Sequence, residues 1–223
     1  MRDLSVYLVA DSASTAGRPL DEIIAAAVAG GVKTVQLRCK DMPAAEFLEV
    51  VRKSSVHTEG RADLLVNDRV DVYLAARASG ASVQGVHIGQ SDIPAELVRA
   101  LIGPDAVLGL SASKDAQIAA ASELNARFPG TIDYLGVGAV HATPTKKDHP
   151  EPLGHAGLAR AVGQSTLPCV AIGGLGLVDI DGIVDGGAAG MAVVRAICSA
   201  EDPQAASAEL LTTWEAAWAG ASR

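Results

Sequence analysis

Aromatic side chains are scarce in this sequence. Only 3% of the 223 residues are Phe, Trp or Tyr, whereas 49% are hydrophobic. The core must therefore be built from Val, Ile, Leu and Ala, and the chain is long enough to bury such a core in one domain. This composition is typical of parallel strands that are buried on both faces and covered by Ala-rich helices.

Positive charge, long apolar runs and cysteine are also in short supply. The net charge of −8 leaves no excess of Lys and Arg for a nucleic-acid groove. No apolar run approaches the roughly 18–20 residues of a membrane span, and the N-terminal stretch lacks the pattern of a signal peptide. Cys39, Cys169 and Cys198 form no CxxC pair, which fits free thiols in a reducing compartment. We expect a cytoplasmic protein that binds neither membrane nor nucleic acid.

Eight short apolar runs recur along the chain, and each ends in small or polar residues. They begin at Val6, Thr34, Leu64, Gly85, Leu108, Tyr134, Cys169 and Gly190, with helix-like segments between them. Residues 19–31, for example, open with Pro and two acids and close on two glycines, as helices do. The last such segment starts at Asp202, a predicted N-cap before Pro203.

Eight strand–helix repeats predict an α/β fold of the (β/α)8 type, a TIM barrel formed by residues 1–223 as a single domain. An open doubly wound sheet is the main alternative. A dinucleotide-binding sheet would carry G-x-G-x-x-G after its first strand, whereas DSASTAG follows the first strand here. We therefore favour the barrel.

The active site of such a barrel lies at the C-terminal ends of its strands. The polar residues and glycines at these ends and in the loops after them are Gln36, Arg38, Lys40, Asn67, Asp68, His87, Gln90, Asp92, Ser111, Ser113, Thr143, Thr145, Lys146, Lys147, Gly173, Gly174 and Arg195. They supply carboxylates, cations, hydroxyls and flexible backbone, and they include no obvious Ser–His–Asp or Cys–His set. Such a set suits the binding of a small anion.

The segment QLRCK places three polar side chains on one face of a strand. Alternation points Gln36, Arg38 and Lys40 one way and turns Leu37 and Cys39 to the other. Cations in a row are costly to bury unless an anion neutralises them. We predict a clamp for phosphate or diphosphate, in which Arg38 contacts two oxygens. The alternative is that Arg38 pairs with a carboxylate while Lys40 extends into solvent.

Two aspartates follow neighbouring strands. Asp68 and Asp92 beside a cationic clamp predict a Mg²⁺ site, because this ion takes one or two carboxylates together with water and phosphate oxygens. Alternatively each caps the helix that follows it, and one Asp can serve both purposes. His87 lies among apolar neighbours, which favours a hydrogen-bonded interior residue over a catalyst.

Gly-rich backbone follows the seventh strand. In this fold the loops after strands seven and eight often hold a phosphate on backbone amides. Gly174 would let the backbone approach such a ligand closely. The alternative role for Gly174 is a tight turn without a ligand.

Six segments together resemble the thiamine-phosphate synthase family. They are VQLRCKD, VNDRVDVYLAA, GVHIGQSDIP, LGLSAS, DYLGVGAVHATPTKKD and VAIGGL, and the similarity spans nearly the whole chain. The resemblance implies a (β/α)8-barrel transferase that joins hydroxymethylpyrimidine diphosphate to a thiazole phosphate, releases diphosphate and uses Mg²⁺. The leaving group needs charge stabilisation, and the attacking thiazole nitrogen carries no proton, so no general base is required.

The resemblance also implies roles for individual residues. The pyrimidine diphosphate would be bound by Gln36, Arg38, Lys40, Asn67, Ser111 and Lys146, of which Arg38, Lys40, Ser111 and Lys146 would act in catalysis. The thiazole phosphate would be bound by Thr143, Pro144, Thr145, Gly174, Val194 and Arg195, and Mg²⁺ by Asp68 and Asp92.

Several positions depart from the family pattern. Cys39 stands where an acidic residue is usual, and Arg195 stands where many members have Ser. His141 and Ala142 replace an aromatic or apolar residue and a proline. These substitutions fall beside the predicted diphosphate and thiazole sites.

Three alternative functions stay open. The related thiazole tautomerases carry a His where this chain has Ser113 and lack the acid that matches Asp92, which favours the synthase. A non-catalytic barrel that binds a phosphorylated metabolite and a phosphosugar enzyme are the others. Trp214 and Trp218, four residues apart on the last helix, fit packing on the barrel, which we favour, or a homo-oligomer interface.

Overall fold

The computed structural model describes residues 2–143 and 151–221. Its eight strands run parallel and form a closed barrel in sequence order, with β8 paired to β1. The strands are β1 Val6–Asp11, β2 Thr34–Arg38, β3 Asp63–Asn67, β4 Gly85–Ile88, β5 Val107–Ser111, β6 Tyr134–Val137, β7 Cys169–Ile172 and β8 Gly190–Val193. The predicted single-domain (β/α)8 barrel is confirmed, and each strand begins within one residue of the predicted position.

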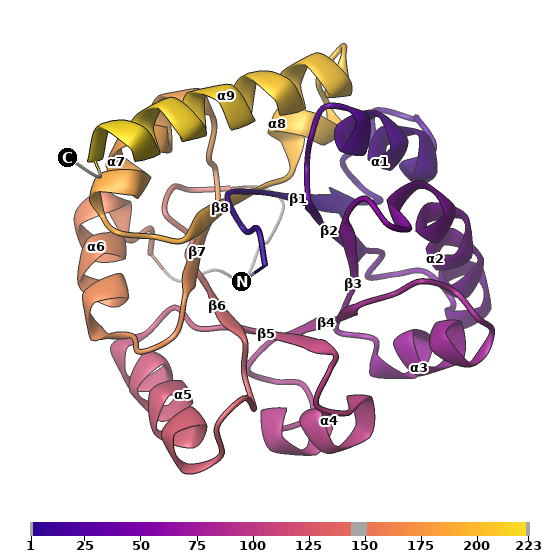
Figure 1. Ribbon diagram of the computed structural model, residues 1–223, viewed down its shortest axis with the longest axis horizontal. Helices are drawn as coiled ribbons and strands as arrows, with labels where there is room; N and C mark the ends of the chain where they lie inside the picture. Colours follow the sequence, from indigo (N-terminus) through magenta and orange to yellow (C-terminus); the bar gives the residue numbers. More distant parts are fainter. Residues whose placement is uncertain (1, 144–150, 222–223) are drawn as a thin grey trace.

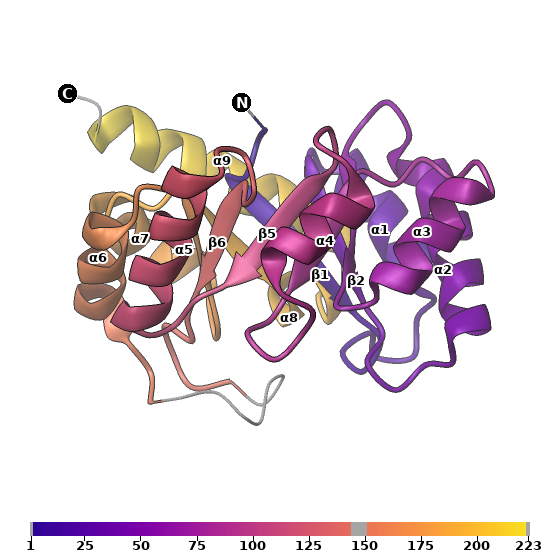
Figure 2. The same ribbon diagram turned by 90° about the horizontal axis from the view of Figure 1, so that it is seen from below.

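Helices surround the barrel on all sides (Figure 1). They are α1 Leu20–Ala29, α2 Ala44–Thr58, α3 Val70–Ala78, α4 Ala95–Ile102, α5 Asp115–Arg127, α6 Gly154–Gln164, η1 Leu177–Asp179, α7 Ile180–Asp185, α8 Arg195–Cys198 and α9 Pro203–Ala221. Figure 2 shows the barrel from the side, with the strands inclined between the helices. Within the described residues, no helix combines the length and apolarity needed to cross a membrane.

The last helix packs against α1, α7 and α8 along one side of the molecule (Figure 1). The Oδ1 atom of Asp202 accepts hydrogen bonds from the backbone N–H groups of Gln204 and Ala205, both at 3.0 Å, so the predicted N-cap is confirmed. Trp214 of α9 is buried in the outer core, as the favoured packing role predicts, whereas Trp218 stacks on it and is 45% exposed. The packing role therefore holds for Trp214, and that of Trp218 stays a prediction.

Side chains alternate between two apolar regions along each strand. On β1, Leu8 and Ala10 point outward into the large core between strands and helices, whereas Tyr7 and Val9 point into the barrel. The interior cluster consists of Leu4, Tyr7, Val9, Leu65, Val107, Tyr134, Val170 and Ala192. Two of the few aromatic residues thus lie in the barrel interior, although the outer core is largely aliphatic as predicted.

Glycines make room for these interior rings. A Cβ atom added at Gly109 would lie 2.3 Å from Cζ of Tyr134 and 2.4 Å from Nδ1 of His87. A Cβ atom at Gly136 would lie 3.0 Å from Cε1 of His87. The missing side chains on β5 and β6 therefore create the space that the His87 and Tyr134 rings occupy.

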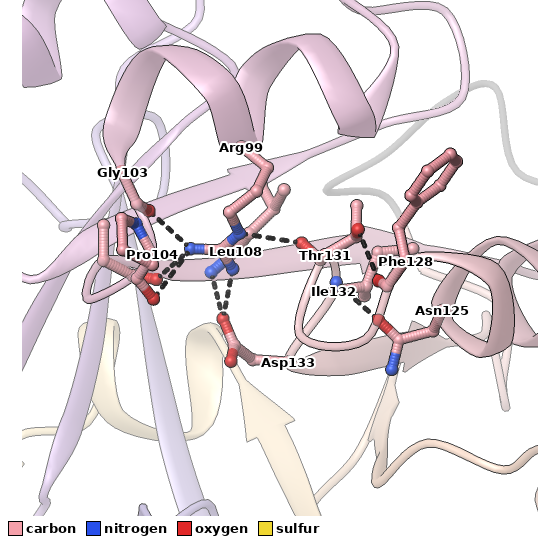
Figure 3. A network of polar contacts seen from close by, with 10 residues as sticks. Arg99, Gly103, Pro104, Leu108, Asn125, Phe128, Thr131, Ile132 and Asp133 are labelled. Atoms are coloured by element: carbon pink, nitrogen blue, oxygen red, sulfur yellow. Dashed lines mark hydrogen bonds and ion pairs between the residues drawn. The ribbon is translucent and has the colours of Figure 1, made fainter.

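One arginine connects the chain segments that lead into β5 and β6 (Figure 3). Arg99 of α4 donates hydrogen bonds to the carbonyl oxygens of Gly103 at 2.9 Å and Thr131 at 3.1 Å, and to Oδ2 of Asp133 at 2.8 Å. The same Asp133 oxygen accepts from the N–H of Leu108 at 2.7 Å. This network lies at the N-terminal ends of the strands, away from the expected active site.

Replacing Arg99 with Met should therefore lower stability without changing the site. The variant keeps the apolar stem but leaves partly buried carbonyl oxygens without donors, and we expect the free energy of unfolding to fall by about 2–3 kcal/mol. For a chain of this size, that loss lowers Tm by about 4–12 °C. Arg52→Met on the exposed face of α2 serves as the control and should change Tm by about 1 °C or less. Equal Tm values for the two variants would contradict the structural role of Arg99.

Candidate active site

A cavity of about 1130 Å³ opens at the C-terminal ends of the strands. The predicted site residues within the described chain all line it, namely Gln36, Arg38, Lys40, Asn67, Asp68, Ser111, Asp92, Thr143, Gly174, Val194 and Arg195. His87, Gln90, Ser113 and Gly173 line it as well. Pro144, Thr145, Lys146 and Lys147 lie outside the described residues.

Arg38 forms an ion pair with Asp11 at the end of the neighbouring strand β1. Asp11 is buried, and its Oδ1 atom accepts a hydrogen bond from the N–H of Ala13 at 2.8 Å. The alternative that Arg38 pairs with a carboxylate is thus confirmed, and the same side chain also lines the cavity. The sequence analysis did not include Asp11 among the candidate site residues, although it is the last residue of the first apolar run.

The predicted alternation along QLRCK is confirmed. Gln36 and Arg38 point toward the cavity, whereas Leu37 and Cys39 are buried in the outer core. Burial raises the pKa of the Cys39 thiol to about 11, so this thiol is protonated at neutral pH. Lys40 follows the end of β2, is exposed, and lines the cavity.

Asp68 and Asp92 lie side by side at the ends of β3 and β4. Burial and the charge of Asp92, to which it is hydrogen-bonded, raise the pKa of the Asp68 carboxyl to about 6, and the charge of Lys40 opposes this rise. The Oδ2 atom of Asp92 accepts from the N–H of Gly89 at 2.6 Å. Two adjacent carboxylates repel each other unless a proton or a cation lies between them, so this pair has the chemistry of a Mg²⁺ site.

The alternative capping roles of these aspartates are wrong. Helix α3 has Arg69 at its N-cap position and α4 has Pro94 there, and neither helix start has a side-chain cap hydrogen bond. Asp68 instead has a left-handed backbone with φ of 60°, which only Gly, Asn and Asp adopt readily. The backbone turns at Asp68 and brings its carboxyl group to Asp92.

A chain of hydrogen bonds crosses the barrel interior below the cavity. Nε2 of Gln36 donates to the Tyr7 hydroxyl at 2.7 Å, and the Tyr7 and Tyr134 hydroxyl oxygens are 2.8 Å apart. Nδ1 of His87 lies 2.9 Å from the Tyr134 oxygen, and Nε2 of His87 lies 3.0 Å from Oγ of Ser111. His87 is therefore a hydrogen-bonded interior residue, as favoured, and it connects the two predicted diphosphate ligands Gln36 and Ser111.

The sequence analysis did not identify Tyr7 and Tyr134, because they lie at the start of their apolar runs, whereas the active site is expected at the opposite ends. Burial raises the pKa of both Tyr7 and Tyr134 well above 10, so both hydroxyls keep their protons at neutral pH. The alternation of side chains on β1 and β6 was the available signal, because it turns both rings into the barrel.

The loops after β6 and β7 touch each other beside the cavity. Gly173 and Gly174 have φ values of 106° and 69°. A Cβ atom at Gly174 would lie 2.9 Å from Cβ of His141 and 3.0 Å from the carbonyl oxygen of Ala142. Glycine is thus required here by both backbone conformation and space. After β8, Val194 precedes α8, and the exposed Arg195 begins that helix.

These features define a (β/α)8-barrel protein whose pocket combines cations, paired carboxylates and Gly-rich loops. A family model described as thiamine monophosphate synthase matches residues 6–197. A thiamine-phosphate synthase from Vibrio parahaemolyticus is 41% identical over 213 residues, 95% of this chain and 98% of that protein. A thiamine-phosphate synthase from Laribacter hongkongensis is 42% identical over 214 residues, 94% of this chain and 95% of that protein.

Solved structures agree with this relationship. Thiamine phosphate pyrophosphorylase from Pyrococcus furiosus superposes with a TM-score of 0.81 at 29% identity, covering 97% of this chain and 98% of that one. Orotidine 5'-phosphate decarboxylase from Pyrococcus horikoshii, at 12% identity and a TM-score of 0.66, shares the fold alone. The chain therefore belongs to the thiamine monophosphate synthase family, and the predicted transferase activity of a thiamine-phosphate synthase is confirmed.

Asp68→Asn should stabilise the metal-free protein. Asn tolerates the left-handed backbone, and its amide can donate a hydrogen bond to the Asp92 carboxylate. It therefore removes both the buried charge and the repulsion from Asp92 that together raise the pKa of Asp68. Because Asp68 is partly exposed, we expect the free energy of unfolding to rise by only about 1 kcal/mol, which raises Tm by about 2–4 °C.

This gain depends on pH. In the folded state the Asp68 carboxyl has a pKa of about 6, whereas its ordinary value is 3.8. The unfavourable ionisation is therefore fully present above pH 6 and is relieved as the pH falls toward 4. Thermal melts in chelator at pH 7.5 and pH 4 measure the difference. A lower Tm for the variant than for wild type at pH 7.5 would contradict the predicted repulsion.

Tyr134→Phe should destabilise the barrel interior. The substitution removes a hydrogen-bond partner of both the Tyr7 hydroxyl and Nδ1 of His87. We expect the free energy of unfolding to fall by about 2 kcal/mol, which lowers Tm by about 4–8 °C. Tyr73→Phe, which changes a buried tyrosine of α3 outside the barrel, is the matched control and should lose less than half as much. Chemical denaturation compares the two variants, and equal losses would count against the interior network.

Proposed function

We propose that this pocket joins hydroxymethylpyrimidine diphosphate to a thiazole phosphate and releases diphosphate. The observation that carries this proposal is the Asp68–Asp92 pair beside Arg38 and Lys40 in one cavity. Loss of diphosphate leaves a cation-like methylene group on the pyrimidine, and the thiazole nitrogen attacks it through its lone pair. The C–O bond to the diphosphate breaks first, with its electron pair leaving on the diphosphate, and the nitrogen lone pair then forms the new C–N bond, so the charges balance without loss of a proton.

The protein's main task in this reaction is to stabilise the negative charge that develops on the leaving diphosphate. Arg38 offers a planar set of donors for two oxygens, and its ion pair with buried Asp11 fixes the direction of the guanidinium. Lys40 adds an exposed ammonium group that lines the cavity. Lys146 keeps its predicted role as a third cation, although it lies outside the described residues.

Asp68 and Asp92 fit the predicted Mg²⁺, because their carboxyl oxygens already share a site that is electrostatically strained without a cation. Mg²⁺ bound there would neutralise diphosphate charge and orient its oxygens. Asn67, at the end of β3, supplies an amide that can contact the same diphosphate.

Neutral groups hold the pyrimidine side of the pocket. Gln36 and Ser111 are fixed by the hydrogen-bond chain through Tyr7, Tyr134 and His87. These residues can orient the pyrimidine ring by hydrogen bonds while contributing no base, which agrees with a reaction that moves no proton.

The thiazole phosphate is proposed to bind at the opposite wall of the cavity. Gly174, Val194 and Arg195 line that wall, and Thr143 lies nearby at the end of the described β6 loop. Backbone N–H groups and the Arg195 guanidinium suit a phosphate. The roles predicted for Pro144 and Thr145 stay predictions, as do the cytoplasmic location and a homo-oligomeric state.

The decisive experiment is diphosphate release from purified protein given both thiamine halves. We expect release that requires both substrates and Mg²⁺, and a loss of at least 100-fold in Asp92→Asn, or about 2.7 kcal/mol in the barrier. Asp105→Asn, an exposed acid before β5 at the other end of the barrel, is the matched control and should retain full activity.

The same assay tests the alternatives. If wild type released no diphosphate but bound the thiazole phosphate, a tautomerase or a non-catalytic binding protein would be the better description. Ser113 lies at the cavity in the position where the resembling tautomerases carry His, and its hydroxyl is a weaker acid–base group than an imidazole. This observation favours the synthase.

A further inference from the structure

Three side chains of types that can bind a metal ion gather outside the cavity, in and after the loops that follow β6 and β7. His141 follows β6, His155 lies in the first turn of α6, and Asp179 ends η1. Their nearest ligand atoms all lie within 4.8 Å of one another. None of the three lines the substrate cavity, so the proposed reaction gives this cluster no role.

The carboxyl group of Asp179 is held in place and faces both imidazoles. Its Oδ2 atom accepts from the N–H of Gly176 at 2.8 Å, while Oδ1 lies 2.6 Å from Nε2 of His141 and 3.4 Å from Nε2 of His155. Asp179 is buried, with 6% of its surface exposed. One carboxylate oxygen is thus the common neighbour of two imidazole nitrogens.

Hydrogen bonds explain the position of His141 beside Asp179 but not that of His155. The contact between His141 and Asp179 is a hydrogen bond, but Nε2 of His155 is buried and has no hydrogen-bond partner among the described residues. A buried ring nitrogen aimed at a carboxylate without a hydrogen bond calls for a missing partner.

The surrounding backbone makes room for His155 in this orientation. A Cβ atom at Gly182 of α7 would lie 2.7 Å from Nδ1 of His155 and 2.9 Å from its Cγ. The His141 and His155 rings meet edge to face, with centroids 5.3 Å apart and an interplanar angle of 77°. Both Nε2 atoms consequently point toward one region beside Asp179.

We propose that His141, His155 and Asp179 form a site for a transition-metal ion such as Zn²⁺. Two imidazoles and one carboxylate are a known type of three-residue zinc site that leaves a fourth position for water or an external ligand. With metal–ligand bonds of about 2.0–2.1 Å, tetrahedral geometry separates neighbouring ligand atoms by about 3.3–3.4 Å. The 3.4 Å contact of His155 already matches this separation, and the 2.6 Å contact of His141 must lengthen when a metal replaces the shared proton.

The site differs in chemistry from the Asp68–Asp92 pair. Imidazole nitrogens favour Zn²⁺ and its transition-metal neighbours, whereas a site built from carboxylates favours Mg²⁺. The two sites should therefore load independently, with Zn²⁺ bound at His141 and His155 even in an excess of Mg²⁺.

A bound ion would tie together loops that shape the substrate pocket. The N–H of His141 donates to the carbonyl oxygen of Gly173 at 2.9 Å, and the backbone of Gly174 packs directly on His141. Fixing His141 to the segments that carry His155 and Asp179 would thus fix the glycine loop after β7. The metal site itself does not depend on the identity of the substrates.

The test is titration of chelator-treated protein with Co²⁺ in excess Mg²⁺, followed by displacement with Zn²⁺. We expect one equivalent of Co²⁺ with the visible absorption of a tetrahedral site with nitrogen ligands, and loss of that absorption when Zn²⁺ is added. His155→Gln and His141→Gln should each weaken binding at least tenfold. Two separate variants are used so that poor folding of one does not decide the outcome.

Two control variants locate the ion. His57→Gln changes a histidine in the last turn of α2, and Asp92→Asn changes the proposed Mg²⁺ site. Both should bind Co²⁺ as wild type does. Absence of binding in wild type, or equal binding in wild type and both cluster variants, would overturn the proposal, as would loss of the Co²⁺ signal in Asp92→Asn alone.

Discussion

The alternation of side chains along eight parallel strands is the constraint on which the site depends. A closed barrel gives each strand an outward face that the helices cover and an inward face with little space. The rings of His87 and Tyr134 fit inside because Gly109 and Gly136 carry no side chain. The same alternation turns the last inward position of each strand, such as Ser111, toward the cavity.

The sequence was sufficient to predict the strands. It also predicted that Gln36 and Arg38 face the cavity and that Cys39 faces away, because side chains alternate along a strand with a period of two residues. It was insufficient for partners that are distant along the chain. The Arg38–Asp11 ion pair depends on the register between β1 and β2. The hydrogen bonds of His87 depend on where two glycines leave space, which no local pattern encodes.

Asp68 lowers the stability of the segment that contains it, yet the fold holds its carboxyl group beside Asp92. Its left-handed backbone and its proximity to Asp92 are both unfavourable by themselves, and such positions are typical of functional sites. The capping roles suggested by the sequence failed here because the chain turns before each helix begins. The sequence pattern therefore predicted the helices α3 and α4 correctly but wrongly suggested that Asp68 and Asp92 cap them.

The pairing of β1 with β8 has a consequence for folding. Val6 pairs with Met191, so the barrel can close only after almost the whole chain is available. The remaining strand pairs join neighbours in sequence and need shorter loops to close, at a smaller loss of chain entropy. Pairing of β1 with β8 therefore loses more chain entropy than any other strand pairing in the barrel. Helix α9 packs across α1 and α7, and these contacts stabilise the closed barrel.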